Sequence, residues 1–232
     1  MRVTAGKIYD YRTITKIIAK GILENSYKYI GVTGTSCVGK STFTKLIRKQ
    51  LEKAGYTVRV VMMDDYLLER FRAGTQFWNR SESTYLKPEY FNWSRCKENI
   101  DKLKLGESVT IEGYIRGIGW GNSITLEPAD FIIVDGLFLD SMQAADYMEY
   151  DYLISLTATD EFITELRLAR DEYYRQNYKN FNRTVEETKK EIENTLLAGK
   201  SYKICFDKWK SMRLRVSERF KAVPQKQRQR VC

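Results

Sequence analysis

The chain of 232 residues contains no histidine and has four cysteines and three prolines. Without histidine there is no histidine metal ligand, no histidine general base and no Ser-His-Asp triad. Any acid–base chemistry must therefore use Asp, Glu, Lys, Tyr or Cys side chains. The spacing of the cysteines matches neither a zinc site nor a disulfide framework, so we expect reduced thiols and a cytoplasmic protein. The cysteines are Cys37, Cys96, Cys205 and Cys232.

Long apolar runs are also missing. No stretch approaches the roughly 20 apolar residues that cross a bilayer, and the first residues lack the apolar core of a signal peptide. We therefore expect no membrane association. The length fits a single domain over residues 1–232, with an N-terminal helix within 1–28 and a basic, flexible tail at 221–232.

The net charge of +9 is compatible with anionic small molecules and with nucleic acid. The basic residues are dispersed, and their one dense run is the tail. This distribution favours a small-molecule partner over nucleic acid. The sequence does not show the oligomeric state, and a homo-oligomer is left open.

One stretch fits a complete phosphate-binding motif, G-x-x-x-x-G-K-[ST], at residues 34–41. A β-rich segment precedes it, and apolar residues at helical spacing follow it. This context favours a phosphate site over a chance glycine turn, because backbone N–H groups and a helix N-terminus would face the anion. Lys40 would reach the β- and γ-phosphates and the Ser41 hydroxyl would ligate Mg²⁺. The predicted nucleotide-binding residues are Gly34, Thr35, Ser36, Cys37, Val38, Gly39, Lys40, Ser41 and Thr42.

Two further β-rich segments end in carboxylates. Residues 57–63 lead into Asp64 and Asp65, and residues 131–134 lead into Asp135. The first segment completes a strand–helix–strand unit, so its strand should run parallel to the strand before the glycine loop. Ligands bind at the carboxyl ends of parallel strands, so Asp64 could accept a proton from an attacking hydroxyl and Asp135 could hold Mg²⁺. The alternative for each aspartate is a turn cap.

A polar and aromatic excursion over residues 67–87 has no clear period, and its length is typical of a functional loop. Residues 109–112 and 123–126 look like paired strands, and the glycine-rich segment between them predicts a flexible hairpin end on the substrate side. Arg116, in that segment, could meet an anionic acceptor or be a surface residue. The candidate substrate-binding residues are Asp65, Tyr66, Tyr85, Tyr114 and Arg116.

Arginines gather on a predicted helix that follows the buried strand at residues 151–156. Arg167 and Arg170 are three residues apart and share a helix face, where two guanidinium groups could clamp phosphate oxygens. The alternative is a salt-bridged face, because Asp171 lies four residues from both Arg167 and Arg175. Further helices are predicted at residues 11–25, 94–105, 184–197 and 202–220.

Together these motifs resemble the uridine kinase and phosphoribulokinase group of P-loop kinases over residues 29–190. The resemblance implies a three-layer α/β P-loop NTPase fold with a mainly parallel central sheet, a helical lid and a small substrate-side hairpin. The segments that carry it are Gly34–Ser41, Met63–Tyr66, Pro88–Trp93, Glu127–Gly136 and Arg167–Asp171 with Arg175.

The resemblance also implies roles for the matching residues. Asp64 would be the general base, and Lys40, Arg167 and Arg170 would act with it on the transferring phosphoryl group. Arg175 would contact the nucleotide from the lid. The implied metal ligands are Ser41, Asp64 and Asp135.

The departures from the family pattern concern the acceptor. Tyr114 matches a tyrosine that uridine kinases place around the nucleoside, whereas the histidine expected near Gly119 is missing. Leu86 stands where the family has an acid, and Asp135 replaces the commoner glutamate. The family's last strand is not recognisable after Leu197.

We therefore predict an enzyme, a kinase with ATP and Mg²⁺ as cofactors, that phosphorylates a hydroxyl of a uridine- or cytidine-like nucleoside. One alternative is the same scaffold acting on a phosphorylated sugar, pantothenate or another hydroxy metabolite. The other alternative is a nucleotide-binding protein or nucleic-acid-stimulated ATPase, which the basic tail motivates.

Overall fold

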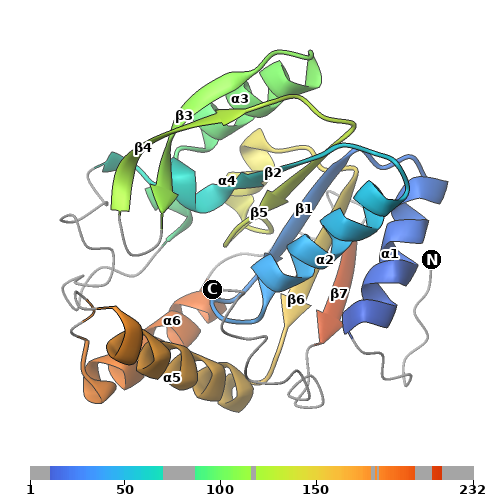
Figure 1. Ribbon diagram of the computed structural model, residues 1–232. Helices are drawn as coiled ribbons and strands as arrows, with labels where there is room; N and C mark the ends of the chain where they lie inside the picture. Colours follow the sequence, from blue (N-terminus) through green and yellow to red (C-terminus); the bar gives the residue numbers. More distant parts are fainter. Residues whose placement is uncertain are drawn as a thin grey trace.

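The computed structural model describes residues 11–69, 87–115, 119–178, 181, 183–201 and 211–215. These residues form a parallel sheet with helices on both faces and an antiparallel hairpin beside it (Figure 1). The predicted three-layer α/β fold is confirmed. The elements are α1 (Tyr11–Glu24), β1 (Tyr29–Gly34), α2 (Lys40–Lys53), β2 (Val58–Met62), the 3₁₀ turns η1 (Met63–Tyr66) and η3 (Pro88–Tyr90), α3 (Trp93–Lys104), β3 (Val109–Ile115), β4 (Gly119–Leu126), β5 (Phe131–Asp135), α4 (Met142–Tyr147), β6 (Tyr152–Thr157), α5 (Asp160–Asn177), α6 (Val185–Ser201) and β7 (Ser211–Arg215).

The central sheet has the strand order β2-β5-β1-β6-β7, and every neighbouring pair is parallel. Asp135, the last residue of β5, lies opposite Val32 of β1 and Met62 of β2. The predicted parallel relation of β1 and β2 is confirmed, with β5 between them. Because the three strands end together, the loop before α2, Asp135 and η1 meet at one edge of the sheet.

Alternating strand residues fill an apolar core on each face of the sheet. Ile30 and Ile133 point to the face covered by α1 and α2, whereas Ile132 and Val134 point to the face covered by α3, α4 and the hairpin. Burying an aliphatic side chain of this size contributes roughly 1.5–3 kcal/mol. The two cores therefore hold the strand ends, and the residues that follow them, in fixed positions.

Local sequence signals account for several element boundaries. The predicted strand pair is confirmed as the β3–β4 hairpin, with Val109 opposite Leu126. The helix predicted at residues 184–197 is confirmed as α6, and a capping box begins it. The Thr184 N–H donates to the Glu187 carboxylate at 2.7 Å, and the Glu187 N–H donates to the Thr184 hydroxyl at 3.1 Å.

The helix predicted over residues 202–220 was wrong at residues 211–215. Residues 211–215 form β7, which pairs with β6, although we expected a helix over 202–220 and no final strand. Met212 and Leu214 alternate with polar residues, and this period of two is typical of a strand. Residues 202–210 and 216–232, which include the basic tail at 221–232, lie outside the described residues. In the part of the chain that is described, no helix is both long and apolar enough to cross a membrane.

Candidate active site

The loop between β1 and α2 is shaped by two glycines with positive φ, 142° at Gly34 and 96° at Gly39. A Cβ atom at Gly34 would lie 2.3 Å from the Leu156 carbonyl oxygen, so another residue would force the backbone apart. Gly39 is the N-cap of α2 and provides no side-chain cap. The first amides of α2 can therefore face an anion, and the helix dipole adds partial positive charge.

A further residue of the loop also has a left-handed backbone. Cys37 has φ 68°, which costs a non-glycine residue roughly 1–2 kcal/mol. Its Sγ lies 3.9 Å from the Ser36 hydroxyl. Val38 is buried in the core, so only its backbone can face a ligand. Strain of this kind is characteristic of ligand-binding loops.

Lys40, the first residue of α2, folds its side chain over the loop. Its Nζ donates to the carbonyl oxygens of Gly34 and Thr35, both at 2.9 Å. Burial lowers the pKa of Lys40, while the nearby Asp135 and Asp64 carboxylates act to raise it. The ammonium group thus lies within electrostatic range of both carboxylates that the sequence assigned to the site.

Asp135 is 2% exposed at the end of β5. Burial raises its pKa, and the Lys40 charge opposes that shift. The buried Oδ2 atom has no hydrogen-bond partner among the described residues. Leaving a buried carboxylate oxygen without a partner is costly, and a divalent cation would offset this cost. Ser41 is close enough to Asp135 to influence its pKa, so the two residues fit a shared Mg²⁺ ion.

A full protein cage for a metal is not present in the described part of the chain. No group of three or more Cys, Asp or Glu side chains there could hold an ion. A Mg²⁺ site does not require such a cage, because Mg²⁺ is usually held by one or two carboxylates together with nucleotide phosphates.

Asp64 lies in η1, which begins where β2 ends. It is partly exposed, and its charge influences the pKa of both Lys40 and Asp135. The structure therefore brings together Lys40, Asp135 and Asp64, which come from three separate segments of the sequence. Their meeting follows from the strand order, because β5 lies between β1 and β2.

The two residues after Asp64 have different surroundings. Asp65 accepts a hydrogen bond from the Tyr114 N–H at 2.8 Å and so connects η1 to the hairpin. Tyr66 is 3% exposed, and its hydroxyl accepts a hydrogen bond from Asn99 at 3.1 Å. Asp65 thus anchors the segment that carries Tyr114, whereas Tyr66 is part of the core. Two more predicted substrate-binding residues, Tyr85 and Arg116, lie outside the described residues.

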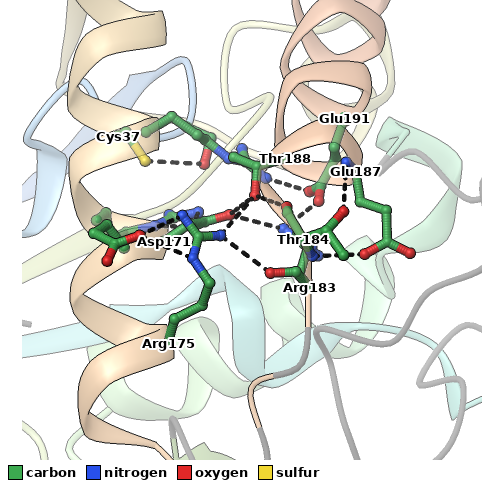
Figure 2. A network of polar contacts seen from close by, with 12 residues as sticks. Cys37, Asp171, Arg175, Arg183, Thr184, Glu187, Thr188 and Glu191 are labelled. Atoms are coloured by element: carbon green, nitrogen blue, oxygen red, sulfur yellow. Dashed lines mark hydrogen bonds and ion pairs between the residues drawn. The ribbon is translucent and has the colours of Figure 1, made fainter.

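A network of ion pairs joins α5 to α6, and Asp171 lies at its centre (Figure 2). Its Oδ1 accepts from Arg170 Nε at 3.1 Å and Nη2 at 3.0 Å. Its Oδ2 accepts from Arg183 at 3.3 Å and from the Thr188 hydroxyl at 3.1 Å. Burial acts to raise the pKa of Asp171, but Arg170, Arg167 and Arg183 outweigh it and lower the pKa.

The other predicted arginines have partners in the same network. Arg167 is 5% exposed and pairs with Glu191, which also pairs with Arg183. Arg175 pairs with Glu172 at 2.9 Å and donates to the Arg183 carbonyl at 3.1 Å. These arginines are salt-bridged in this structure, but Arg167 and Arg175 have other partners than the Asp171 that helical spacing predicted, and Arg167 is buried. Sequence reasoning missed Arg183 and Glu191, because no local spacing connects them to α5.

The network lies next to the phosphate loop. Arg170 is within electrostatic range of Cys37 and Lys40. Of the three predicted arginines, Arg170 therefore connects the network electrostatically to the loop.

The comparison with known proteins agrees with this geometry. The model of the phosphoribulokinase/uridine kinase family matches residues 29–202. The chain belongs to this family. Members of the phosphoribulokinase/uridine kinase family are small-molecule kinases, and this protein is a kinase of that type. The family match begins at the residue where β1 begins, so α1 lies outside it.

Relatives in the phosphoribulokinase/uridine kinase family include the uridine kinases of Staphylococcus haemolyticus (strain JCSC1435) and Staphylococcus aureus (strain JH9). They are 29% and 28% identical to this chain over 194 residues, which cover 77% of this chain and 91% of each relative. The solved structure of a D-glycerate 3-kinase from Cryptococcus neoformans has a TM-score of 0.68 at 11% identity, covering 90% of this chain and 96% of that one. This structural likeness concerns the fold alone.

Proposed function

We propose that the protein is an ATP-dependent kinase that transfers the γ-phosphate to a hydroxyl group of a uridine- or cytidine-like nucleoside. The observation that carries this proposal is the convergence of Lys40, Asp135 and Asp64 at one edge of the sheet. A cation for the phosphates, a carboxylate for the metal and a carboxylate for the acceptor proton are the groups that phosphoryl transfer needs.

On the donor side, the loop amides and Lys40 would hold the phosphates. The Lys40 ammonium group has three N–H donors, and two of them bind the Gly34 and Thr35 carbonyl oxygens in this structure. When nucleotide binds, these hydrogen bonds would be exchanged for hydrogen bonds to β- and γ-phosphate oxygens. Asp135 and Ser41 would hold Mg²⁺. When bound, Mg²⁺ neutralises charge that develops on the phosphate oxygens.

On the acceptor side, Asp64 would accept the proton of the attacking hydroxyl. Its partial exposure allows a substrate to approach, whereas Asp135 is too buried to meet one. General-base catalysis of this kind contributes typically about 10²–10⁴-fold to the rate. The α5 arginines would add positive charge around the transferring group.

The nucleoside acceptor is supported by the names of the curated relatives, which are uridine kinases, and by the position of Tyr114 on the anchored hairpin. A second candidate is a non-nucleoside hydroxy metabolite. It is favoured by the complete absence of histidine from the sequence, since the resemblance places a histidine beside the nucleoside.

The test is an assay of ADP release and phosphorylated product with ATP, Mg²⁺ and a panel of nucleosides, sugar phosphates, pantothenate and glycerate. We expect product from uridine or cytidine. Product only from another acceptor would identify the second candidate, and ADP release without phosphorylated product would contradict kinase activity on the whole panel.

The base is tested by Asp64→Asn, which should lower kcat by about 10²–10⁴-fold and change the KM for ATP little. Asp101→Asn is the matched control, because Asp101 is an exposed aspartate that pairs with Lys97 on α3. Unchanged turnover in Asp64→Asn would show that Asp64 is not the base.

A further inference from the structure

Helix α1 precedes the segment that the family model matches, and it packs along α2 (Figure 1). Its apolar face enters the core beneath α2 through Ile14, Ile18 and Ile22. This packing explains why the helix is attached to the sheet. It does not explain the polar contact that the first turn of α1 makes.

That contact joins Tyr11 to the phosphate loop. The Tyr11 ring lies 5.9 Å from the Phe43 ring of α2, at an interplanar angle of 60°. Its hydroxyl donates a hydrogen bond to the Val38 carbonyl oxygen at 3.2 Å. The Tyr11 carbonyl in turn accepts from the Thr15 hydroxyl at 2.7 Å, within the first turn of the helix. The ring contact with Phe43 and the hydrogen bond to Val38 thus hold the Tyr11 side chain at the loop.

The hydrogen bond has a consequence for the adjacent amide. The Val38 carbonyl and the Gly39 N–H belong to one trans peptide unit, in which they point in opposite directions. Holding the carbonyl toward Tyr11 therefore turns the Gly39 N–H away from α1. In a phosphate loop of this sequence, the backbone N–H groups are the anion cradle.

Tyr11 also fits closely against the start of α2. Gly39 has φ 96°, and a Cβ atom on it would lie 2.7 Å from the Tyr11 hydroxyl oxygen. Glycine therefore meets two requirements at position 39: it adopts a positive φ without strain, and it leaves room for the Tyr11 hydroxyl. Burial raises the pKa of Tyr11, so the hydroxyl stays protonated and remains a donor at neutral pH.

We propose that Tyr11 is a positioning residue of the nucleotide site, whose hydroxyl orients the Val38–Gly39 peptide for binding phosphate. The proposal rests on the proposed function, because it requires that the loop binds nucleotide. It assigns to α1, which lies outside the family match, a part in nucleotide binding.

The test uses full-length Tyr11→Phe, which removes only the hydroxyl. A fluorescent ATP analogue is titrated in the presence of Mg²⁺ and then displaced by ATP and, separately, by inorganic tripolyphosphate. Losing one hydrogen bond that orients the loop should raise the Kd for both displacing ligands about fivefold. In the kinase assay the KM for ATP should rise by a similar factor, while the KM for the acceptor stays the same.

Tyr27→Phe is the matched control. Tyr27 follows α1 and stacks on Tyr152 with ring centroids 5.2 Å apart. The nucleotide affinity of the Tyr27→Phe variant should match that of the wild type. Thermal unfolding of both variants shows that they are folded.

The outcomes separate the two proposals. If the wild type does not bind MgATP, the proposed function fails. If the wild type binds and Tyr11→Phe binds equally well, the role of Tyr11 is refuted while the kinase assignment stands. A loss of affinity for ATP without a loss for tripolyphosphate would also refute it, because the effect would then concern the nucleoside and not the phosphates.

Discussion

Asp171→Asn should destabilise the α5–α6 segment, because it removes the negative charge at the centre of the arginine network. The Asp171 side chain is 0% exposed, and those of Arg170 and Arg183 are 20% and 11% exposed. Removing one partner of a buried ion pair costs about 3–5 kcal/mol, since the remaining charges stay buried. The partners keep some contact with water, and asparagine retains one oxygen, so we expect a loss near 3 kcal/mol.

Hydrogen exchange of the backbone amides of α5 and α6 is the direct measurement, because it reports local opening separately from global unfolding. Urea denaturation shows whether the loss also reaches the rest of the fold. Asp101→Asn is again the matched control. Its pair with Lys97 is exposed to solvent, so its loss should change the amide protection little.

The pH dependence gives a second, independent readout. The arginines hold the pKa of Asp171 below its ordinary value of 3.8. Its contribution to stability is therefore present above that value and is lost as the pH falls through the lower pKa of the folded state. The difference in the free energy of unfolding between the wild type and Asp171→Asn should be constant near neutral pH and should shrink in acid.

Two results would refute this reasoning. Amide protection in α5 and α6 that falls by no more than in the control would show that the network is not a source of stability. A stability difference between the wild type and Asp171→Asn that stays unchanged in acid would show that the charge of Asp171 does not cause the difference.

Two more predictions concern the site. Asp135→Asn should abolish Mg²⁺-dependent turnover and raise the unfolding temperature of the ligand-free protein at neutral pH, because burial raises the pKa of Asp135 and makes its charged form costly. That cost is present above the raised pKa of the folded state and disappears below the ordinary pKa of the unfolded state. A gain in unfolding temperature that does not shrink in acid would therefore contradict the prediction. Asp65→Ala should raise the KM for the acceptor about three- to tenfold, because the Tyr114 N–H loses a charged acceptor. Asp65→Asn keeps an acceptor oxygen and should behave like the wild type in the same steady-state assay, and an unchanged KM in Asp65→Ala would contradict the anchoring role.

The nucleotide side of the site could be predicted because its signals are local. The glycine loop, the helix after it and the carboxylates that follow two strands are each visible within a few residues of sequence. The fold then needs only parallel strands to bring Lys40, Asp64 and Asp135 to one edge. What the sequence does not show is the order of the strands, because the position of β5 between β1 and β2 depends on contacts between distant segments.

The arginine network could not be predicted in this way. Its decisive pairs connect Arg183 to Asp171 over 12 residues and Arg167 to Glu191 over 24. Helical spacing instead favoured Asp171 with Arg167 or Arg175. The contact of Tyr11 with the loop spans 27 residues and has no sequence signature either. Long-range polar contacts therefore account for most of what the sequence left open.

The sequence posed two alternatives for the α5 arginines, a phosphate clamp or a salt-bridged face, and the geometry of Arg170 makes them compatible. Its Nε and Nη2 donate to Asp171, which fixes the plane of the guanidinium group. A guanidinium has five N–H donors, and the pairing with Asp171 uses Nε and Nη2, so we propose that the Nη1 amino group would bind a phosphate oxygen. Because Arg170 lies within electrostatic range of the loop residues Cys37 and Lys40, fixing it through Asp171 would lower the entropic cost of ordering it when nucleotide binds. On this argument, Asp171→Asn should weaken nucleotide binding as well as α5–α6 stability.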